Sequence, residues 1–212
     1  MSDGRDVHAT TAPPETLGSR GMREPGKVWE LALEPDFDSL DDDLKRYIEV
    51  CRERLGLIPN VISANALDSE RLRTFADSYN RLMLGEGSLS KAEREMIAVA
   101  VSSINRCFYC LVAHGAALRE ITGDPILAEA IAFNYRAADL SPRHRALLDF
   151  AAKLTADPAG MDESDRAALR TAGCDDRTIL EVAEVAAFFN MSNRIAAATG
   201  MLPNPEYHAL AR

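Results

Sequence analysis

Apolar residues recur at helical spacing along almost every segment of this chain beyond its N-terminal region. Segment 67–84 is the clearest case, because its apolar side chains fall on one side of a helix and the pattern stops at Gly85. Alternating apolar and polar runs, which are typical of half-buried strands, are almost absent, and there is no Asn-Gly hairpin turn. The sequence therefore predicts an all-α protein, arranged as an orthogonal or bundle-like array of helices.

Capping residues indicate where several of these helices begin. Ser90 followed three residues later by Glu93 forms a capping box, which satisfies two N–H groups of the first turn. Ser141 followed by Pro142 is a cap with proline at the first helical position. Further helices are predicted at 105–120, 126–133, 162–172 and 175–199.

The chain divides into a tail and one folded part. Residues 1–27 are rich in Gly, Pro, Ser, Thr and Arg without an apolar period, so we expect a flexible N-terminal tail. Residues 28–212 are long enough to bury a sizeable core as a single all-α domain. Within this domain, segments Ile97–Asn105 and Val182–Asn190 each contain an apolar run that ends in Asn. This weak similarity suggests the hypothesis of an internal repeat of two helical hairpins.

Charge and composition exclude several classes of partner. The chain has 24 basic and 33 acidic residues, a net charge of -9, which argues against nucleic acid or an anionic membrane as a partner. No apolar run approaches the length of a membrane span, and the N-terminus lacks the apolar stretch of a signal peptide, so we expect a cytoplasmic protein. Four cysteines in such a protein indicate a redox or metal site with buried thiols rather than a disulfide scaffold.

One cluster of reactive residue types stands out. Cys107, Cys110 and His114 fall on one face if residues 105–120 are helical, and Glu95 precedes Cys107 by twelve residues. With Asn105 as the helix cap, Cys107 would lie in the first turn, where the helix dipole favours a thiolate. Cys110 would lie one turn from His114 and exchange a proton with it. These candidate residues predict redox chemistry by a dithiol.

The other polar and thiol residues have simpler interpretations. Cys51 and Cys174 stand alone and are interpreted as structural thiols. Tyr109, between the two cysteines of the cluster, is interpreted as a packing residue. Asn193 and Arg194 are polar residues within an apolar helix, and we interpret them as a surface or buried structural pair. As an alternative, Arg194 binds a neighbouring subunit or a carboxylate at the site.

The cluster and its surroundings resemble a known group of proteins. The pattern E-x11-C-x2-C-x3-H is similar to the signature of the alkylhydroperoxidase D and carboxymuconolactone decarboxylase superfamily, and the similarity extends over roughly residues 54–206. The resemblance to the branch called peroxidase-related enzymes implies an alkylhydroperoxidase D-like helical fold, a homo-oligomer and a hydroperoxide-reducing dithiol. The residues that carry it include Leu55 to Asn60, Leu89-Ser90, Glu93 to Glu95, Asn105 to His114, Ala138 to Ser141, Phe189-Asn190 and Asn193-Arg194.

The resemblance also implies roles for the matching residues. Cys110 would attack the peroxide and become a sulfenic acid, Cys107 would condense with it to a disulfide, and His114 with Glu95 would relay protons. The dipole argument favours Cys107 as the more acidic thiol while the spacing to His114 favours Cys110, and we favour Cys110. Tyr109 stands where the family often has a second histidine, a departure that bears on peroxidase strength.

No organic cofactor is needed for this chemistry, and a lipoyl or thioredoxin-like carrier is the expected type of thiol reductant. Phe108, Leu111 and Val112 are expected to line a pocket for an organic peroxide. The apolar helix within 181–199 favours subunit contacts in a homo-oligomer.

Three other functions stay open at this stage, one of which is an oligomeric structural or regulatory protein with a vestigial site. The same Cys107, Cys110, His114 and Glu95 cluster has the residue types of a zinc site, so a zinc-binding redox-sensing or structural protein is the main alternative. A lactone decarboxylase is the second alternative, although acid–base chemistry of that kind does not require a pair of thiols.

Overall fold

The computed structural model describes residues 26–212, and within this range every regular element is a helix. The all-α prediction is therefore confirmed. The predicted flexible tail at 1–27 lies outside the described residues, apart from its last two positions. No helix of the described range is both long enough and apolar enough to cross a bilayer.

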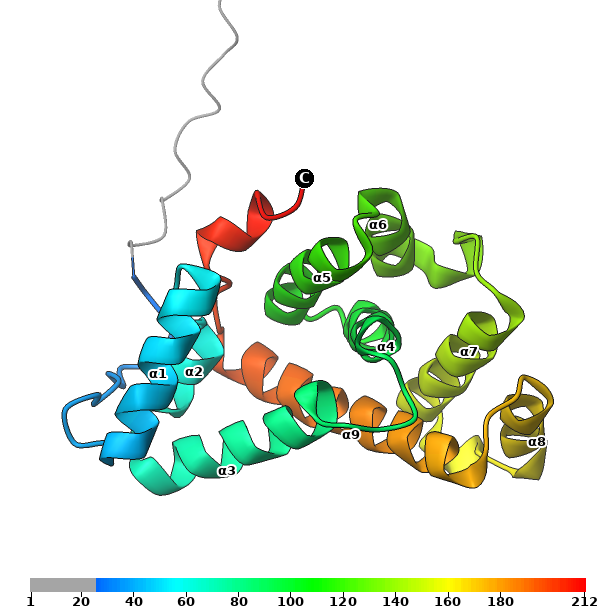
Figure 1. Ribbon diagram of the computed structural model, residues 1–212, viewed down its shortest axis with the longest axis horizontal. Coiled ribbons are helices and arrows are strands. Elements are labelled where there is room, and N and C mark those ends of the chain that lie inside the picture. The colour runs from blue at the N-terminus through cyan, green and yellow to red at the C-terminus, as the bar shows by residue number, and fades with distance from the viewer. Residues whose placement is uncertain (1–25) are drawn as a thin grey trace, which may run out of the picture.

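The chain forms nine α-helices between residues 26 and 212, joined by short loops and single turns (Figure 1). Their bounds are α1 Asp42–Leu55, α2 Asn60–Asn65, α3 Ser69–Tyr79, α4 Lys91–Ile104, α5 Phe108–Thr122, α6 Pro125–Asn134, α7 Pro142–Ala156, α8 Glu163–Thr171 and α9 Asp176–Thr199. A π-helical turn at Asn80–Leu84 extends α3, and 3-10 turns lie at Tyr135–Ala137, Pro158–Gly160 and Pro205–His208.

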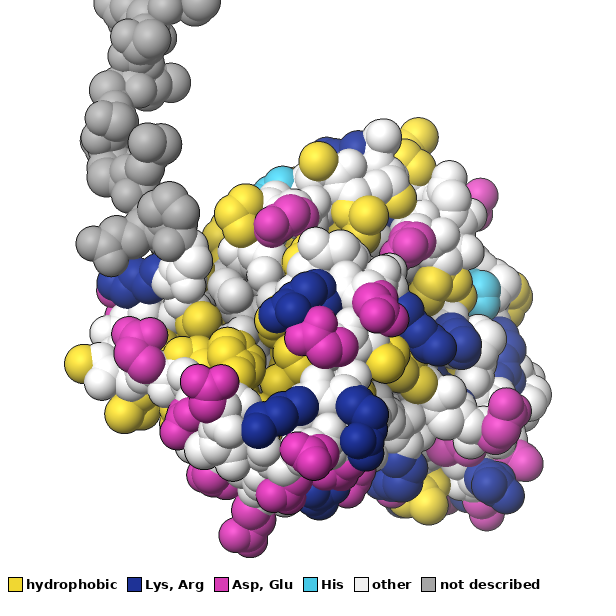
Figure 2. All heavy atoms as spheres, turned by 60° about the vertical axis from the view of Figure 1, so that its left-hand side comes forward, with side chains coloured by type: hydrophobic (Ala, Val, Ile, Leu, Met, Phe, Trp, Pro, Cys, Tyr) yellow, Lys and Arg dark blue, Asp and Glu magenta, His cyan; other side chains and the backbone are white. Residues whose placement is uncertain are grey.

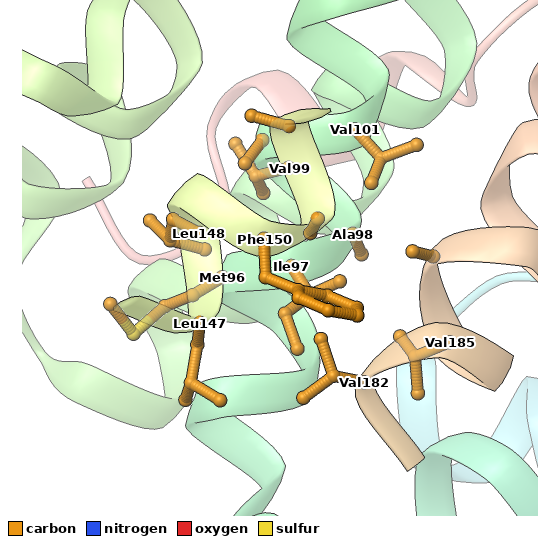
Figure 3. Close-up of a cluster of buried hydrophobic side chains, with 14 of the residues drawn as sticks. Met96, Ile97, Ala98, Val99, Val101, Leu147, Leu148, Phe150, Val182 and Val185 are labelled. Carbon is orange, nitrogen blue, oxygen red and sulfur yellow. The ribbon is translucent and has the colours of Figure 1, made fainter. Parts of the chain in front are cut away.

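Helix α4 is the centre of the molecule. It packs against α5, α6, α7 and α9, and Figure 1 shows it enclosed between them. Every residue from Glu93 to Ser102 is buried, including the charged ones. The largest apolar cluster joins the side chains of α4 to those of α7 and α9, with Ile97, Leu148 and Val182 completely or almost completely removed from solvent (Figure 3). Removing this much apolar surface from water is the main term that holds these helices together.

Two of the predicted caps, Ser90 and Ser141, open their helices as expected. Ser90 Oγ accepts the backbone N–H of Glu93, and the Glu93 carboxylate accepts the backbone N–H of Ser90. Ser141, directly before Pro142, is the N-cap of α7, and its Oγ likewise accepts the backbone N–H of His144. These bonds satisfy N–H groups that the first turn of a helix leaves without an internal partner.

The first described residues of the chain cover the N-terminal end of α5. Trp29 is buried in a cluster with Cys107, Tyr109 and Cys110. The backbone around it pairs with the chain after α9, because Leu202 N–H donates to Val28 C=O at 2.9 Å. Segments far apart in the sequence therefore enclose the two cysteines.

The two segments of the suggested repeat lie in α4 and α9, which pack against each other. Helix α4 ends at Ile104 and turns into α5, whereas α9 continues past Asn190 to Thr199. The two segments thus have different continuations, and a repeat of helical hairpins stays a prediction.

Candidate active site

A tight corner between α4 and α5 positions the first cysteine. Arg106 adopts a left-handed conformation with φ 53°, the N–H of Arg106 donates to Ser103 C=O, and the N–H of Cys107 donates to Ser102 C=O at 2.9 Å. This is a Schellman arrangement, which satisfies the last carbonyls of a helix and reverses the chain direction. A non-glycine residue in this region is strained, and such strain often accompanies a functional site.

The corner changes the expected role of Asn105. This residue is the C-cap of α4 rather than the N-cap of α5, because α5 begins at Phe108 and its N-cap is Cys107. The prediction that Cys107 lies in the first turn of α5 is wrong, because Cys107 directly precedes that turn as its N-cap. The left-handed residue Arg106 separates the two helices. The sulfur still lies at the positive end of α5, where the exposed N–H groups favour negative charge.

The structure brings His114 and Glu95 into direct contact. Nδ1 of His114 on α5 lies 2.7 Å from Oε2 of Glu95 on α4, and the two side chains are only 12% and 7% exposed. The His114 ring also packs edge-on against Phe189, with ring centroids 4.6 Å apart. The carboxylate and the aromatic ring together fix the imidazole, which leaves Nε2 as the nitrogen available for proton exchange.

A hydrogen bond between the two thiols of the cluster shifts their pKa values in opposite directions. Both cysteines are reduced and buried. The Cys110 thiol donates to the Cys107 sulfur, and this bond, helped by the N–H groups of Cys110 and Tyr109 and by the charge of His114, lowers the pKa of Cys107 to about 7. The same bond and burial raise the pKa of Cys110. Near neutral pH the pair therefore tends to hold one proton between two sulfurs.

A small cavity opens beside Cys110 and His114. Its volume is about 60 Å³, enough for several water-sized groups, and Cys107 does not line it. A second cavity of about 340 Å³ shares five wall residues with the first, among them Tyr79, Tyr109 and His114. The walls of the small cavity are mainly apolar and come from Val61, Phe75, Tyr79, Phe188, Phe189, Met191, Ile195, Ala196 and Met201.

The pocket walls differ from those expected from the sequence. Phe108, Leu111 and Val112 line neither of these two cavities, because the sides of α5 that carry them face elsewhere. Phe108 is 52% exposed and its ring lies 6.1 Å from that of His208. The small cavity is lined mostly by α9, and the larger one mostly by α1 and α5. The residues next to the motif in the sequence could not reveal the contributions of α1 and α9.

Tyr109 is buried and has a structural contact. Its hydroxyl oxygen accepts the backbone N–H of Val61 near the start of α2, at 3.1 Å. Burial raises the pKa of this phenol well above its usual range. These contacts agree with the interpretation of Tyr109 as a packing residue, although its ring also lines both cavities.

The remaining cysteines lie in different surroundings. Cys174 directly precedes the N-cap of α9, and its sulfur is 3.3 Å from Nη1 of Arg143 on α7. Cys51 lines the larger cavity. Between residues 26 and 212 no group of three or more His, Cys, Asp or Glu side chains is arranged to hold a metal ion. The zinc alternative therefore gains no support from the geometry.

Sequence reasoning missed several polar residues at the site. Ser192 lines the small cavity, and its buried hydroxyl has no hydrogen-bond partner among the described residues. Asn193 donates to Oγ of Ser102 at 3.1 Å and accepts from Nδ2 of Asn105 at 2.9 Å. The available signal was the polar run at 190–194 within an otherwise apolar helix, which indicates buried polar contacts but not their partners.

The fold is all-helical, and it brings two thiols, an imidazole and a carboxylate together, with Cys110 and His114 on the wall of a small cavity. The model of the carboxymuconolactone decarboxylase family matches residues 70–153. The solved structure of an uncharacterized peroxidase-related protein from Silicibacter sp. TM1040 is 53% identical, with a TM-score of 0.85, and the match covers 91% of this chain and 100% of that one. This chain therefore belongs to the alkylhydroperoxidase D and carboxymuconolactone decarboxylase superfamily.

Two further solved structures show the same fold. An uncharacterized peroxidase-related protein from Ralstonia eutropha JMP134, described as an alkylhydroperoxidase AhpD core, is 40% identical with a TM-score of 0.83, over 88% of this chain and 97% of that one. The debrominase Bmp8 in complex with 2,3,4-tribromopyrrole is 19% identical with a TM-score of 0.73, over 87% of this chain and 97% of that one, and shares the fold alone. No curated protein matches the chain.

Proposed function

We propose that this protein is a thiol-dependent peroxidase that reduces hydroperoxides through a dithiol–disulfide cycle of Cys107 and Cys110. One observation carries the proposal: a hydrogen-bonded thiol pair at a helix N-terminus adjoins a cavity that is also lined by a histidine held by a carboxylate. An ionised sulfur within the pair and an adjacent proton carrier both favour nucleophilic sulfur chemistry, and the lowered pKa belongs to Cys107 while Cys110 lines the cavity. The superfamily membership and the peroxidase-related relatives support the same class of activity.

In the first step, Cys110 attacks because it lines the cavity and Cys107 does not. One of the two thiol protons is held at Nε2 of His114 and the other moves to the Cys107 sulfur, so that Cys110 attacks the terminal oxygen of the hydroperoxide as a thiolate. The O–O bond breaks, the sulfur is oxidised to a sulfenic acid, and the leaving alkoxide takes the proton from His114 to become an alcohol.

In the second step, the Cys107 sulfur attacks the sulfenic sulfur of Cys110. The S–O bond breaks, a disulfide forms, and the leaving hydroxide takes the remaining thiol proton to become water. The sum is two thiols and one hydroperoxide converted to one disulfide, one alcohol and one water. Glu95 holds the His114 ring throughout and stabilises its charged form.

The cavities favour an organic hydroperoxide as the substrate. The smaller cavity has the size of the peroxide group, and the adjoining larger cavity offers about 340 Å³ with mostly apolar walls for the organic part. The buried hydroxyl of Ser192 supports this assignment, because it has no partner in the described part of the chain and stands ready to hydrogen-bond to a bound peroxide oxygen.

The cycle needs a reductant and a suitable compartment. A lipoyl or thioredoxin-like carrier would reduce the disulfide by thiol exchange, and we propose the cytoplasm as the location because thiols are kept reduced there. We also propose a homo-oligomer. Large apolar side chains of α9 that border the small cavity, such as Met191 and Ile195, are still 50% and 41% exposed. Hydrophobic side chains also gather among charged ones on the face that Figure 2 presents.

Thiol counting before and after one equivalent of an organic hydroperoxide tests the function. The reduced protein has four thiols, and we expect two to disappear as one alcohol is formed. The Cys107→Ser and Cys110→Ser variants should not form the internal disulfide, whereas a matched control, Cys174→Ser, should still lose two thiols like the parent. No thiol loss from the parent, or full turnover by Cys110→Ser, would contradict the proposal.

A lactone decarboxylase is the competing activity, because the matched family model carries that name. Its acid–base chemistry would use Glu95 and His114 and would not depend on sulfur. Decarboxylation by a variant in which both Cys107 and Cys110 are serine would favour that reading over the peroxidase.

A further inference from the structure

Aromatic side chains line much of the larger cavity, and the proposed reaction uses none of these rings. Four of the five tyrosines of the chain lie on its wall together with Phe75. They are Tyr47 of α1, Tyr79 of α3, Tyr109 of α5 and Tyr207 of the last 3-10 turn, and Phe75 also belongs to α3. Rings from four separate segments of the chain therefore border one cavity of about 340 Å³.

The larger cavity leads from the surface of the molecule to the candidate active site. Val50 and Leu84 on its wall are 42% and 54% exposed, whereas Tyr109 on the same wall is buried. His114 lines this cavity and also the small one, which Cys110 borders. Because the small cavity has only about 60 Å³, a hydroperoxide with its O–O bond beside Cys110 would extend its organic part between the aromatic rings.

Two of the rings form a row that ends at the imidazole. The rings of Phe75 and Tyr79 are stacked, with centroids 6.1 Å apart and an interplanar angle of 19°. The Tyr79 ring in turn lies 6.5 Å from the His114 ring, and all three side chains line both cavities. A planar aromatic group can pack against such rings with the faces and edges that aromatic pairs prefer, whereas a saturated group gains only the burial of its surface.

The charged groups of the wall give no preference for a charged organic part. Arg54 and Glu120 have opposite charges, and both are exposed. Apart from these two residues, His114, Cys51 and Asn80, every residue of the wall is aromatic or aliphatic. The interior of the cavity therefore suits an uncharged aromatic group.

We infer that the larger cavity selects hydroperoxides whose organic part carries an uncharged aromatic ring. The ring lies among Tyr47, Tyr79 and Tyr207, and the O–O bond lies beside Cys110 in the small cavity. The inference rests on the proposed function, in which Cys110 attacks a hydroperoxide, and it names the class of substrate. The aromatic side chains of the wall act as specificity-determining residues and take no part in the proton transfers.

The test compares two alcohols that differ only in whether their ring is aromatic. Cumyl alcohol is the product expected from cumene hydroperoxide, and its cyclohexyl analogue has a ring of similar size that is more apolar. Burial alone would favour the cyclohexyl compound, whereas contacts between aromatic rings favour the phenyl compound. In isothermal titration calorimetry with the reduced protein, we expect cumyl alcohol to bind about fivefold more tightly or better.

Two variants locate the preference within the cavity. Tyr47→Leu and Tyr207→Leu each replace a ring of the wall with an aliphatic side chain, so each should reduce the preference for cumyl alcohol by about twofold or more. Phe133→Leu is the matched control, because Phe133 is 85% exposed on α6 and lines neither cavity. Circular dichroism establishes which variants fold, and if neither wall variant does, the comparison of the two alcohols on the parent protein decides.

The inference is overturned if the parent binds neither alcohol, if it binds the cyclohexyl analogue equally or more tightly, or if the folded wall variants keep the full preference. The calorimetry needs no turnover, so its failure is separate from a failure of the proposed function. Loss of two thiols on addition of hydroperoxide, without a preference for the aromatic alcohol, would remove the aromatic selection alone. A clear preference in a protein that loses no thiols would keep the aromatic site and remove the peroxidase.

Discussion

Nδ1 of His114 lies 2.7 Å from Oε2 of Glu95, although the two residues are on different helices and 19 positions apart in the sequence. The contact exists because the α4–α5 corner folds α5 back along α4. It gives one partly buried imidazole a fixed orientation and a carboxylate that stabilises its charged form. The proposed proton transfers depend on this pair.

Glu95→Gln should lower hydroperoxide turnover by about 10²-fold, because the amide still accepts or donates one hydrogen bond but no longer stabilises a charged imidazole. Stopped-flow measurement of the first thiol oxidation at neutral pH checks the effect. Glu129→Gln is a matched control, since Glu129 pairs with Arg212 at the surface. Equal rates for Glu95→Gln and the parent would exclude the proton relay.

Cys107→Ser should stop the cycle at the sulfenic acid. Without the second sulfur, Cys110 can be oxidised but has no partner with which to condense. A dimedone adduct on Cys110, located by mass spectrometry after one equivalent of hydroperoxide, would record this state. An adduct that instead forms on Cys107 in the Cys110→Ser variant, with Cys107→Ser unreactive, would reverse the order of attack.

The lowered pKa of Cys107 predicts how stability depends on pH. The value falls from 9.0 to about 7 in the folded chain, so between these values the folded state holds fewer protons at this thiol than the unfolded state. Its contribution to stability is therefore complete above pH 9 and is lost as the pH falls through 7. Urea unfolding should show the parent gaining on the order of 1 kcal/mol per pH unit over this window relative to Cys107→Ser. Parallel pH curves for the two proteins would contradict the shift.

Leu148→Ala should destabilise the protein by about 2–5 kcal/mol, because the side chain is completely buried where α7 packs on α4 (Figure 3). The matched substitution Leu180→Ala, at a side chain that is 59% exposed, should change the free energy of unfolding by less than about 1 kcal/mol. Urea denaturation of both variants gives the comparison. Similar losses at the two positions would mean that Leu180 is covered in solution.

Met191→Glu should reduce the molar mass measured by light scattering, because it places a charge on the exposed apolar face of α9 proposed as a subunit contact. Phe133 on α6 is 85% exposed and provides the comparison. If only Phe133→Glu dissociates the assembly, the contact lies on α6 instead. A parent that is already a monomer would remove the proposed homo-oligomer.

Local patterns in the sequence were sufficient for the helices and their starts. The apolar period of 67–84, the capping box of Ser90 with Glu93 and the Ser141-Pro142 start depend on residues within a few positions of one another, and each appears as predicted. The spacing that brought Glu95, Cys107, Cys110 and His114 to attention is likewise readable in one dimension. The start of α5 was misplaced because the left-handed Arg106 carries no turn signal comparable to glycine.

By itself the sequence determined that the chain is helical, where its helices lie, and which residue types are available for chemistry, since periodicity and capping are local properties. Only the tertiary structure decided that Glu95 contacts His114, that Cys110 rather than Cys107 lines the cavity, and that Asn105 hydrogen-bonds to Asn193 of α9. These contacts join α4, α5 and α9 through the packing of whole helices, whose relative placement depends on the summed burial of many side chains and on no single motif.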